Sequence, residues 1–240
     1  MRLVKEHIAG WQAVFQRHPF FERFAGAASI KDAMAFAPNL MFWVRVFQDI
    51  LRLNHTLIRD PAMKTIATHH REEDAGHESW FVADLAALGA EQCDVEFLFS
   101  PENAMTRDTA YGLVSEVYRA TDDRVRIAFV LALESAGHVF FERTAAYIEK
   151  VGLNGELRYF SSSHLKVEKE HTLYDDRSTE LVDDIILSPA LREESFGMIE
   201  RVYHAFIAMF DGLADVEHVE PPPSRLRAHS GGMPPESRGR

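Results

Sequence analysis

The sequence contains a single cysteine, Cys93, so the chain cannot form an internal disulfide. It also lacks a long apolar run. The longest stretch without a charged residue covers residues 33 to 44 and includes Pro38, which is well short of the roughly 20 apolar residues that cross a bilayer. The opening residues, MRLVKEHIAGW, contain no continuous apolar segment of the signal-peptide type. These absences argue against a disulfide-stabilised or membrane-spanning protein, and we expect a cytoplasmic one.

Positive charge is scarce. The chain has 26 Lys and Arg residues against 37 Asp and Glu residues, a formal net charge of -11. Residues 221 to 240 hold four arginines and one glutamate, so the preceding residues carry -14. Such a surface repels nucleic acid and anionic membranes. We therefore expect neither as a partner, and a small-molecule substrate instead.

Alternating strand patterns are also missing, whereas helical periodicity runs through most of the chain. We expect a short helical turn at HPFFERF, a loop over residues 90 to 106, and Thr106 as the cap of the helix that follows. The sequence predicts an all-α fold, a single bundle of seven or eight helices over residues 1 to 215, followed by a disordered tail over residues 216 to 240. The long helices are expected at residues 2–16, 39–59, 61–88, 107–120, 121–150, 155–174 and 189–213.

The stretch HHREEDAGHESW carries three histidines and four acidic residues within one predicted helix. His70, Glu73, Asp74 and His77 share a face, because residues three, four and seven apart lie together on an α-helix. A solvated face with salt bridges would also explain the pattern. However, His77 lies on the same side as the apolar Phe81, which favours an inward orientation.

Glu134 interrupts the apolar run IAFVLALESAGHVFFER. A buried carboxylate costs several kcal/mol unless it is paired, hydrogen-bonded or bound to a cation. A hydrogen bond to His138 or to an arginine would compensate it, and a metal ion would do so equally well.

The segment SSSHLKVEKEHTLYDD places His164, Glu168 and His171 at positions i, i+4 and i+7, which form one stripe along a helix. Together with the two segments above, this stripe brings carboxylates and imidazoles from three separate helices. Facing Glu and His side chains in helix bundles build two-metal carboxylate sites. Oxygen and nitrogen ligands without thiolates suit iron or manganese better than structural zinc.

These residues resemble the haem-oxygenase-like diiron oxidases, the superfamily that includes the chlamydial death-domain-associated protein and is related in fold to thiaminase-like proteins. The resemblance rests on His164-x-x-x-Glu168-x-x-His171, on Glu134 and on the EEDAGHESWFVADLAALG run, and it covers roughly residues 35 to 213. Many members place a carboxylate where this chain has His70, and Asp where it has Glu168. The resemblance implies a seven-helix bundle, often a homodimer, with these metal ligands: Glu73, His77, Glu134, His164, Glu168 and His171.

The resemblance further implies two ferrous ions per chain, with manganese as a substitute, and dioxygen as co-substrate. The oxidised substrate would be a small amine-, amino-acid- or fatty-acid-like molecule. We expect His70 and His138 to support the ligands or to transfer protons. The expected pocket walls are aromatic: Phe42, Trp43, Phe47, Trp80, Phe81, Phe141 and Tyr203.

Three other functions compete with this interpretation. A haem-binding haem oxygenase would need an axial histidine, for which His7 and His18 are candidates, and a glycine-rich distal helix, which the sequence does not show. A thiaminase-like hydrolase would need a nucleophilic cysteine in its pocket. A metal-free bundle could act as a binding or adaptor protein, in which case Glu134 would pair with a basic side chain.

Overall fold

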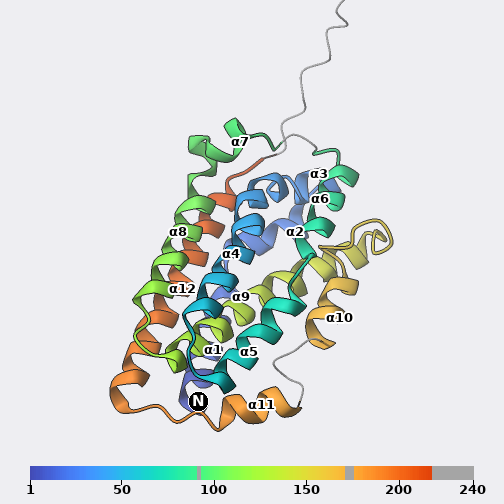
Figure 1. Ribbon diagram of the computed structural model, residues 1–240. Helices are drawn as coiled ribbons and strands as arrows, with labels where there is room; N and C mark the ends of the chain where they lie inside the picture. Colours follow the sequence, from blue (N-terminus) through green and yellow to red (C-terminus); the bar gives the residue numbers. More distant parts are fainter. Residues whose placement is uncertain (91–92, 171–175, 218–240) are drawn as a thin grey trace, which may run out of the picture.

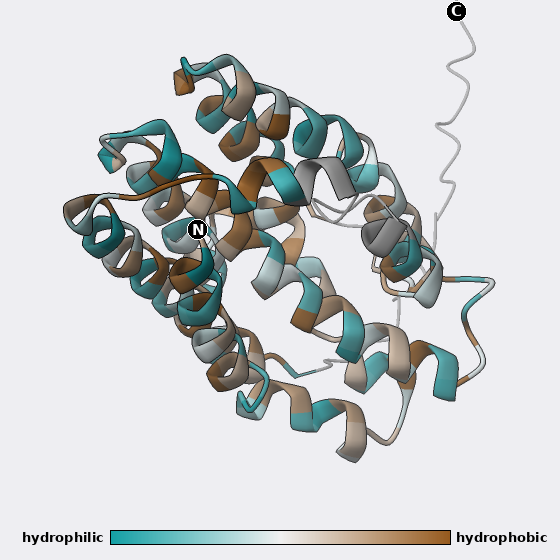
Figure 2. Cartoon of the chain, turned by 90° about the horizontal axis from the view of Figure 1, so that it is seen from below, coloured by the Kyte–Doolittle hydropathy of each residue, from teal (hydrophilic) through white to brown (hydrophobic). Residues whose placement is uncertain are grey.

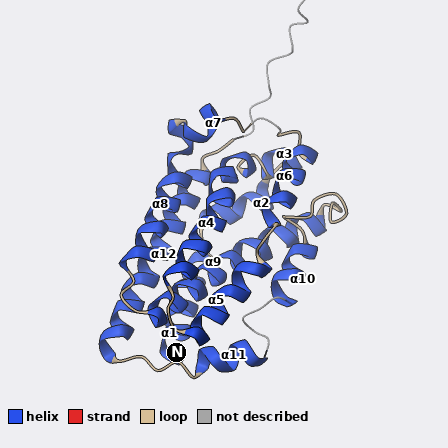
Figure 3. Ribbon diagram, viewed as in Figure 1, coloured by secondary structure: helices blue, strands red, loops and turns tan. Residues whose placement is uncertain are grey.

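The computed structural model describes residues 1–90, 93–170 and 176–217, without the side chains of residues 167–179. Every regular element in these ranges is a helix (Figures 1 and 3). Eight of the described helices have nine or more residues, in keeping with the predicted seven or eight. The elements in chain order are α1 (Arg2–Phe15), η1 (Pro19–Glu22), α2 (Arg23–Gly26), α3 (Ile30–Ala33), η2 (Ala37–Leu40), α4 (Met41–Leu57), α5 (Pro61–Glu73), α6 (His77–Ala87), α7 (Val95–Phe99), η3 (Pro101–Asn103), α8 (Ala104–Arg119), α9 (Asp123–Lys150), α10 (Ser162–Glu170), α11 (Asp176–Asp183) and α12 (Pro189–Ala214).

Capping residues explain where the long helices begin. The Asp60 carboxylate accepts the N–H groups of Ala62 and Met63 at 2.9 and 3.0 Å, and Pro61 occupies the first helical position of α5. The side chain of Asp122 caps α9 in the same way, and that of Ser188 caps α12. Because such caps are local, the predicted starts of these helices are confirmed to within two residues.

Helix α9 forms the centre of the bundle. It packs against α12, α1, α10 and α5, while α4 packs against α8 and α5 (Figure 1). Figure 2 shows hydrophilic and hydrophobic residues interspersed along the long helices. At helical periodicity this pattern places the apolar side chains on the face that packs into the core. Edge-to-face aromatic contacts fill that core, with Phe20 and Phe15 at 4.7 and 4.9 Å from the ring of Phe210.

The predicted helix over residues 61 to 88 is in fact two helices. Helix α5 ends at Glu73 and α6 begins at His77, with Gly76 between them at φ 94°. Only glycine adopts this left-handed conformation without cost. The Glu78 carboxylate accepts the Gly76 N–H at 3.1 Å, and the Ser79 hydroxyl donates to the Gly76 carbonyl at 2.6 Å. The single-helix prediction is therefore wrong, and this break determines the geometry of the candidate site.

Two smaller differences concern the segments beside the bundle. Residues 90 to 106 are not a plain loop, because Asp94 caps the short helix α7 by accepting the Phe97 N–H at 2.8 Å. Helix α8 begins at Ala104, so Thr106 lies inside it rather than capping it. The predicted helix over residues 155–174 corresponds to α10, which begins only at Ser162.

The predicted disordered tail lies outside the described residues from residue 218 onward. Val216, just before it, is held by Arg23, whose guanidinium donates to the Val216 carbonyl at 2.8 Å. Among the described helices, none combines the length and the apolar character needed to cross a bilayer.

Candidate metal centre

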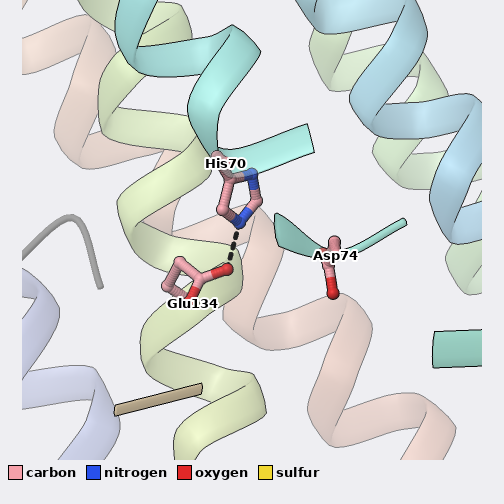
Figure 4. Close-up of side chains that lie close together, drawn as sticks. All are labelled: His70, Asp74 and Glu134. Carbon is pink, nitrogen blue, oxygen red and sulfur yellow. Dashed lines mark hydrogen bonds and ion pairs between the residues drawn. The ribbon is translucent and has the colours of Figure 1, made fainter. Parts of the chain in front are cut away.

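Glu134 on α9 is paired with a histidine. Its Oε1 contacts Nε2 of His70, which comes from the last turn of α5 (Figure 4). The His70 side chain is only 6% exposed and that of Glu134 is 28% exposed. The prediction that Glu134 needs compensation is confirmed, although the partner is neither His138 nor an arginine.

Asp74 lies next to this pair at the end of α5. One ligand atom each from His70, Asp74 and Glu134 falls within 4.8 Å of the other two (Figure 4). The Asp74 Oδ2 atom is buried and has no hydrogen-bond partner among the described residues. A buried carboxylate oxygen without a partner is costly, and a bound cation would remove that cost.

The two histidines His77 and His164 meet on the other side of Asp74. Nδ1 of His77 lies 3.2 Å from Asp74 Oδ1 and 3.1 Å from Nε2 of His164. Both imidazoles are buried, at 6% and 1% exposure. His77 Nδ1 therefore contacts both a carboxylate oxygen from the end of α5 and a ring nitrogen from α10.

The loop before α10 fixes the orientation of His164. Its Nδ1 lies 2.7 Å from the Tyr159 carbonyl oxygen, which can only accept a hydrogen bond. Nδ1 therefore carries a proton, which leaves Nε2 as the ring nitrogen that can bind a metal. Histidine ligands to metals commonly have this arrangement, in which a backbone carbonyl orients the ring and increases its basicity.

Asp84 on α6 holds that loop in place. Its two carboxylate oxygens accept the N–H groups of Arg158 and Phe160 at 2.7 and 3.1 Å. The side chain is buried, and burial raises the pKa of Asp84, while the N–H groups of residues 158 to 160 oppose this rise. Asp84 thus connects α6 to the carbonyl that orients His164.

Aromatic rings pack around the two histidines. The Trp80 ring lies 4.4 Å from that of His77 at an interplanar angle of 30°, and the Arg158 guanidinium covers the Trp80 ring at 3.6 Å. The Phe141 ring lies 4.2 Å from that of His164. These contacts leave the imidazoles little rotational freedom, as a ligand-binding site requires.

A cavity of about 80 Å³, counted as the space open to the centre of a water molecule, adjoins this group. Asp74, His77 and His164 line it together with apolar side chains from α4, α9 and α12. This volume accommodates several water molecules or a small organic molecule. Of the predicted pocket walls, Trp43, Phe47 and Phe141 line the cavity and are confirmed.

The other predicted wall residues have different roles. Phe42 packs against Phe99 and Tyr111, Phe81 against Tyr159 and Phe160, and Tyr203 donates to Ser135 Oγ at 2.9 Å. Trp80 covers His77 rather than lining the cavity. The expectation that these four residues form cavity walls is wrong, because helical periodicity does not distinguish a cavity wall from the solid core.

The predicted ligands fall into two neighbouring groups that share Asp74: Glu134 lies with His70 and Asp74, and His77 lies with Asp74 and His164. Glu73 lies nearby but forms an ion pair with His69 at 2.8 Å. The Glu168 side chain and His171 lie outside the described residues. These ligand assignments remain predictions.

The two predicted supporting histidines differ in position. His70 lies within the group through its contact with Glu134. His138 pairs with Glu142 at 3.5 Å, is 35% exposed and does not line the cavity. A role for His138 in proton transfer at this site therefore has no support in the geometry.

Asp74 was not predicted as a ligand, although it stands in the acidic stretch. A straight helix would give it the same face as His70 and His77 without distinguishing it from Glu73. The signal that was available is the sequence Asp-Ala-Gly, because glycine after a polar residue is typical of a helix end.

The histidines proposed as axial haem ligands lie outside the cavity lining. His18 lies 3.1 Å from Asp211 and accepts the Phe20 N–H, whereas His7 Nε2 lies 3.6 Å from Glu200, beyond hydrogen-bond distance. Cys93 lies away from the cavity, and burial raises the pKa of its thiol, which disfavours the nucleophilic thiolate. The geometry therefore favours neither an axial haem ligand nor a cysteine nucleophile at these positions.

No protein-family model and no curated protein matches the sequence. Solved structures do resemble the chain. A domain of unknown function with a heme oxygenase-like fold from Shewanella denitrificans OS217 aligns with a TM-score of 0.66 and 16% identity over 88% of this chain and 90% of that one. A TenA homolog from Pseudomonas syringae pv. tomato DC3000 aligns with a TM-score of 0.58 and 15% identity over 88% and 91%. The chain therefore has a haem-oxygenase-like fold, as predicted.

Proposed function

We propose that this protein is an iron-dependent oxidase or oxygenase that uses dioxygen to oxidise a small organic substrate in the cavity beside the α5–α6 break. One observation carries the proposal. A carboxylate oxygen of Asp74 lies within 4.8 Å of ligand atoms of His70 and Glu134, Asp74 Oδ2 is buried without a hydrogen-bond partner among the described residues, and Asp74 Oδ1 lies 3.2 Å from His77.

The chemistry of the donors fits the metal. Imidazole nitrogens and carboxylate oxygens without a thiolate are typical of iron and manganese sites. His77, Glu134 and His164 would hold the metal, with Asp74 as an added ligand, and Glu73, Glu168 and His171 would complete the set for two ions. Because His70 and Glu134 share a hydrogen bond, metal uptake would displace a proton from this pair.

The protein side chains have separate tasks. Bound iron would supply the capacity to activate dioxygen, chemistry that amino acid side chains lack. The Tyr159 carbonyl keeps the proton of His164 on Nδ1, so that Nε2 faces the site. Phe47, Phe140 and Phe141 line the cavity, exclude water and orient the substrate.

A metal-free binding protein is the second candidate, and one observation favours it. The His70–Glu134 contact already provides the carboxylate with a partner, so Glu134 alone does not demand a cation. Asp74 Oδ2 favours a metal site over a metal-free protein, because the His70–Glu134 contact leaves this oxygen without a hydrogen-bond partner among the described residues.

Ferrous reconstitution under anaerobic conditions, followed by metal analysis and an absorption spectrum, tests the proposal. We expect about two irons per chain, no Soret band and oxygen consumption after exposure to air. Glu134→Gln should lose most of the iron, whereas Glu142→Gln, two turns further along α9 on an exposed side chain, should retain it. Asp74→Asn serves as a second loss-of-binding variant, and circular dichroism establishes that each variant is folded. Iron-free wild type, or equal iron in wild type and both site variants, would contradict the proposal.

A further inference from the structure

The cavity beside the candidate metal centre has a marked polarity. Its apolar walls include Leu40, Val44, Leu133, Phe140 and Met209. Its polar lining groups among the described residues are Gln48, Asp74, His77, Glu78, Tyr159 and His164. The acidic groups all come from the α5–α6 break, and the described lining contains no lysine or arginine.

Glu78 is the acidic lining residue that the metal site does not use. It lies in the first turn of α6, is half-buried, and accepts the Gly76 N–H through Oε2. Within the described part of the chain it forms no ion pair. Its carboxylate therefore adds negative charge to the polar end of the cavity.

This charge pattern discriminates between ligand headgroups. A carboxylate in the cavity would face Asp74 and Glu78 without a lysine or arginine to pair with, since the basic groups in the described lining are the imidazoles of His77 and His164, which contact each other. Burying a charge without a strong partner costs several kcal/mol. An ammonium group would instead be attracted by Glu78 and by the faces of Trp43 and Phe47, which line the same cavity.

We propose that the cavity binds an apolar monoamine, with the ammonium group paired to Glu78 and a single ring or short alkyl chain among the aromatic walls. The cavity volume of about 80 Å³ limits the size of the apolar part of the amine. This inference deepens the proposed function and rests on it only for the chemistry that follows binding, since the lining residues bind the amine whether or not a metal is present. Glu78 thereby selects amines over carboxylic acids of the same shape.

Three probes that share one ring test the inference by calorimetry: 2-phenylethylamine, 2-phenylethanol and 3-phenylpropionate. Each is titrated into the full-length protein, metal-free and loaded anaerobically with ferrous iron. We expect the amine to bind at least tenfold more tightly than the acid in the metal-free form, where no metal cation offsets the charge of the acid. Glu78→Gln should reduce amine affinity about tenfold and leave the alcohol unchanged, while the control Glu142→Gln should change neither.

Two outcomes would overturn the inference: equal or tighter binding of the acid by the metal-free protein, or amine affinity unaffected by Glu78→Gln. Iron content, measured on the same samples, keeps the proposed function separate. Amine selectivity without iron binding contradicts the iron-dependent function alone. Iron binding without amine selectivity contradicts the substrate assignment alone.

Discussion

The Nδ1 atom of His164 lies 2.7 Å from the carbonyl oxygen of Tyr159, and this contact joins the candidate metal centre to the loop before α10. The same loop is attached to α6 by Asp84, which accepts two of its N–H groups. The orientation of one imidazole thus depends on a carboxylate that belongs to a different helix and does not itself reach the centre.

Asp84→Asn should weaken metal binding without removing any ligand. Asparagine offers one acceptor where Asp84 uses two oxygens, so one of the N–H groups of Arg158 and Phe160 loses its partner and the Tyr159 carbonyl shifts. Loss of such a supporting contact typically costs about 10- to 100-fold in metal affinity. Ferrous or cobalt titration measures the affinity, and nitrogen NMR of histidine reports whether His164 still carries its proton on Nδ1. An unchanged tautomer and affinity would show that the loop holds its position without Asp84.

Asp74→Asn should weaken metal binding strongly but change the stability of the metal-free protein little. In the metal-free protein the substitution removes a buried charged oxygen that has no described partner, so we expect the free energy of unfolding to fall by less than about 1 kcal/mol or to rise. Bound metal should raise the Tm of wild type by mass action and leave that of the variant nearly unchanged. Thermal melts with and without ferrous iron measure both effects. A strongly destabilised metal-free variant would mean that Asp74 is a structural residue.

Local signals in the sequence account for much of the fold. The starts of α9 and α12 follow from Asp122 and from the Ser188-Pro189 pair, which act on the residues directly beside them. The break at Gly76 was missed because helical periodicity continues through it, and one glycine inside such a pattern is usually tolerated. On a single straight helix Glu73 and Asp74 would both lie on the face of His70 and His77, so the sequence did not distinguish them as ligands.

The contacts that complete the site are long-range, and no spacing rule provides them. Glu134 contacts His70, which is 64 residues away in the sequence, and Asp84 accepts the N–H of Arg158, which is 74 residues away. A carboxylate in an apolar run indicates that some partner exists, which is why the need for one at Glu134 could be predicted. Which partner it is depends on how α5 packs against α9, and that follows from the tertiary structure alone.

Gly76→Ala tests the break between α5 and α6. At φ 94° a side chain strains the backbone, which costs about 1–2 kcal/mol, although no neighbouring atom lies within 4 Å of the added Cβ. Gly10→Ala is the matched control, since Gly10 lies within α1 with equally open space and alanine there should stabilise by about 0.5–1 kcal/mol. Urea unfolding gives both values. Equal stability of the two variants would contradict the left-handed conformation at Gly76.

Asp122→Ala should destabilise the protein in a pH-dependent way, because Asp122 caps α9, the central helix. Its carboxylate accepts the Arg124 N–H at 2.9 Å, and the side-chain hydrogen bonds from the Arg124 guanidinium lower the pKa of Asp122. Loss of an N-cap typically costs about 1 kcal/mol.

The pH dependence follows from the lowered pKa of Asp122, which means that the folded state prefers the charged carboxylate. The stability that the charged cap contributes is therefore present above the ordinary Asp pKa and is lost as the pH falls through the lowered value. The free-energy difference between wild type and Asp122→Ala, measured by urea unfolding from pH 7 downward, should therefore shrink in acid. A Ser115→Ala control, at an exposed position of α8, removes no titratable group. A difference that stays constant with pH would assign the stability loss to packing instead of to the charged cap.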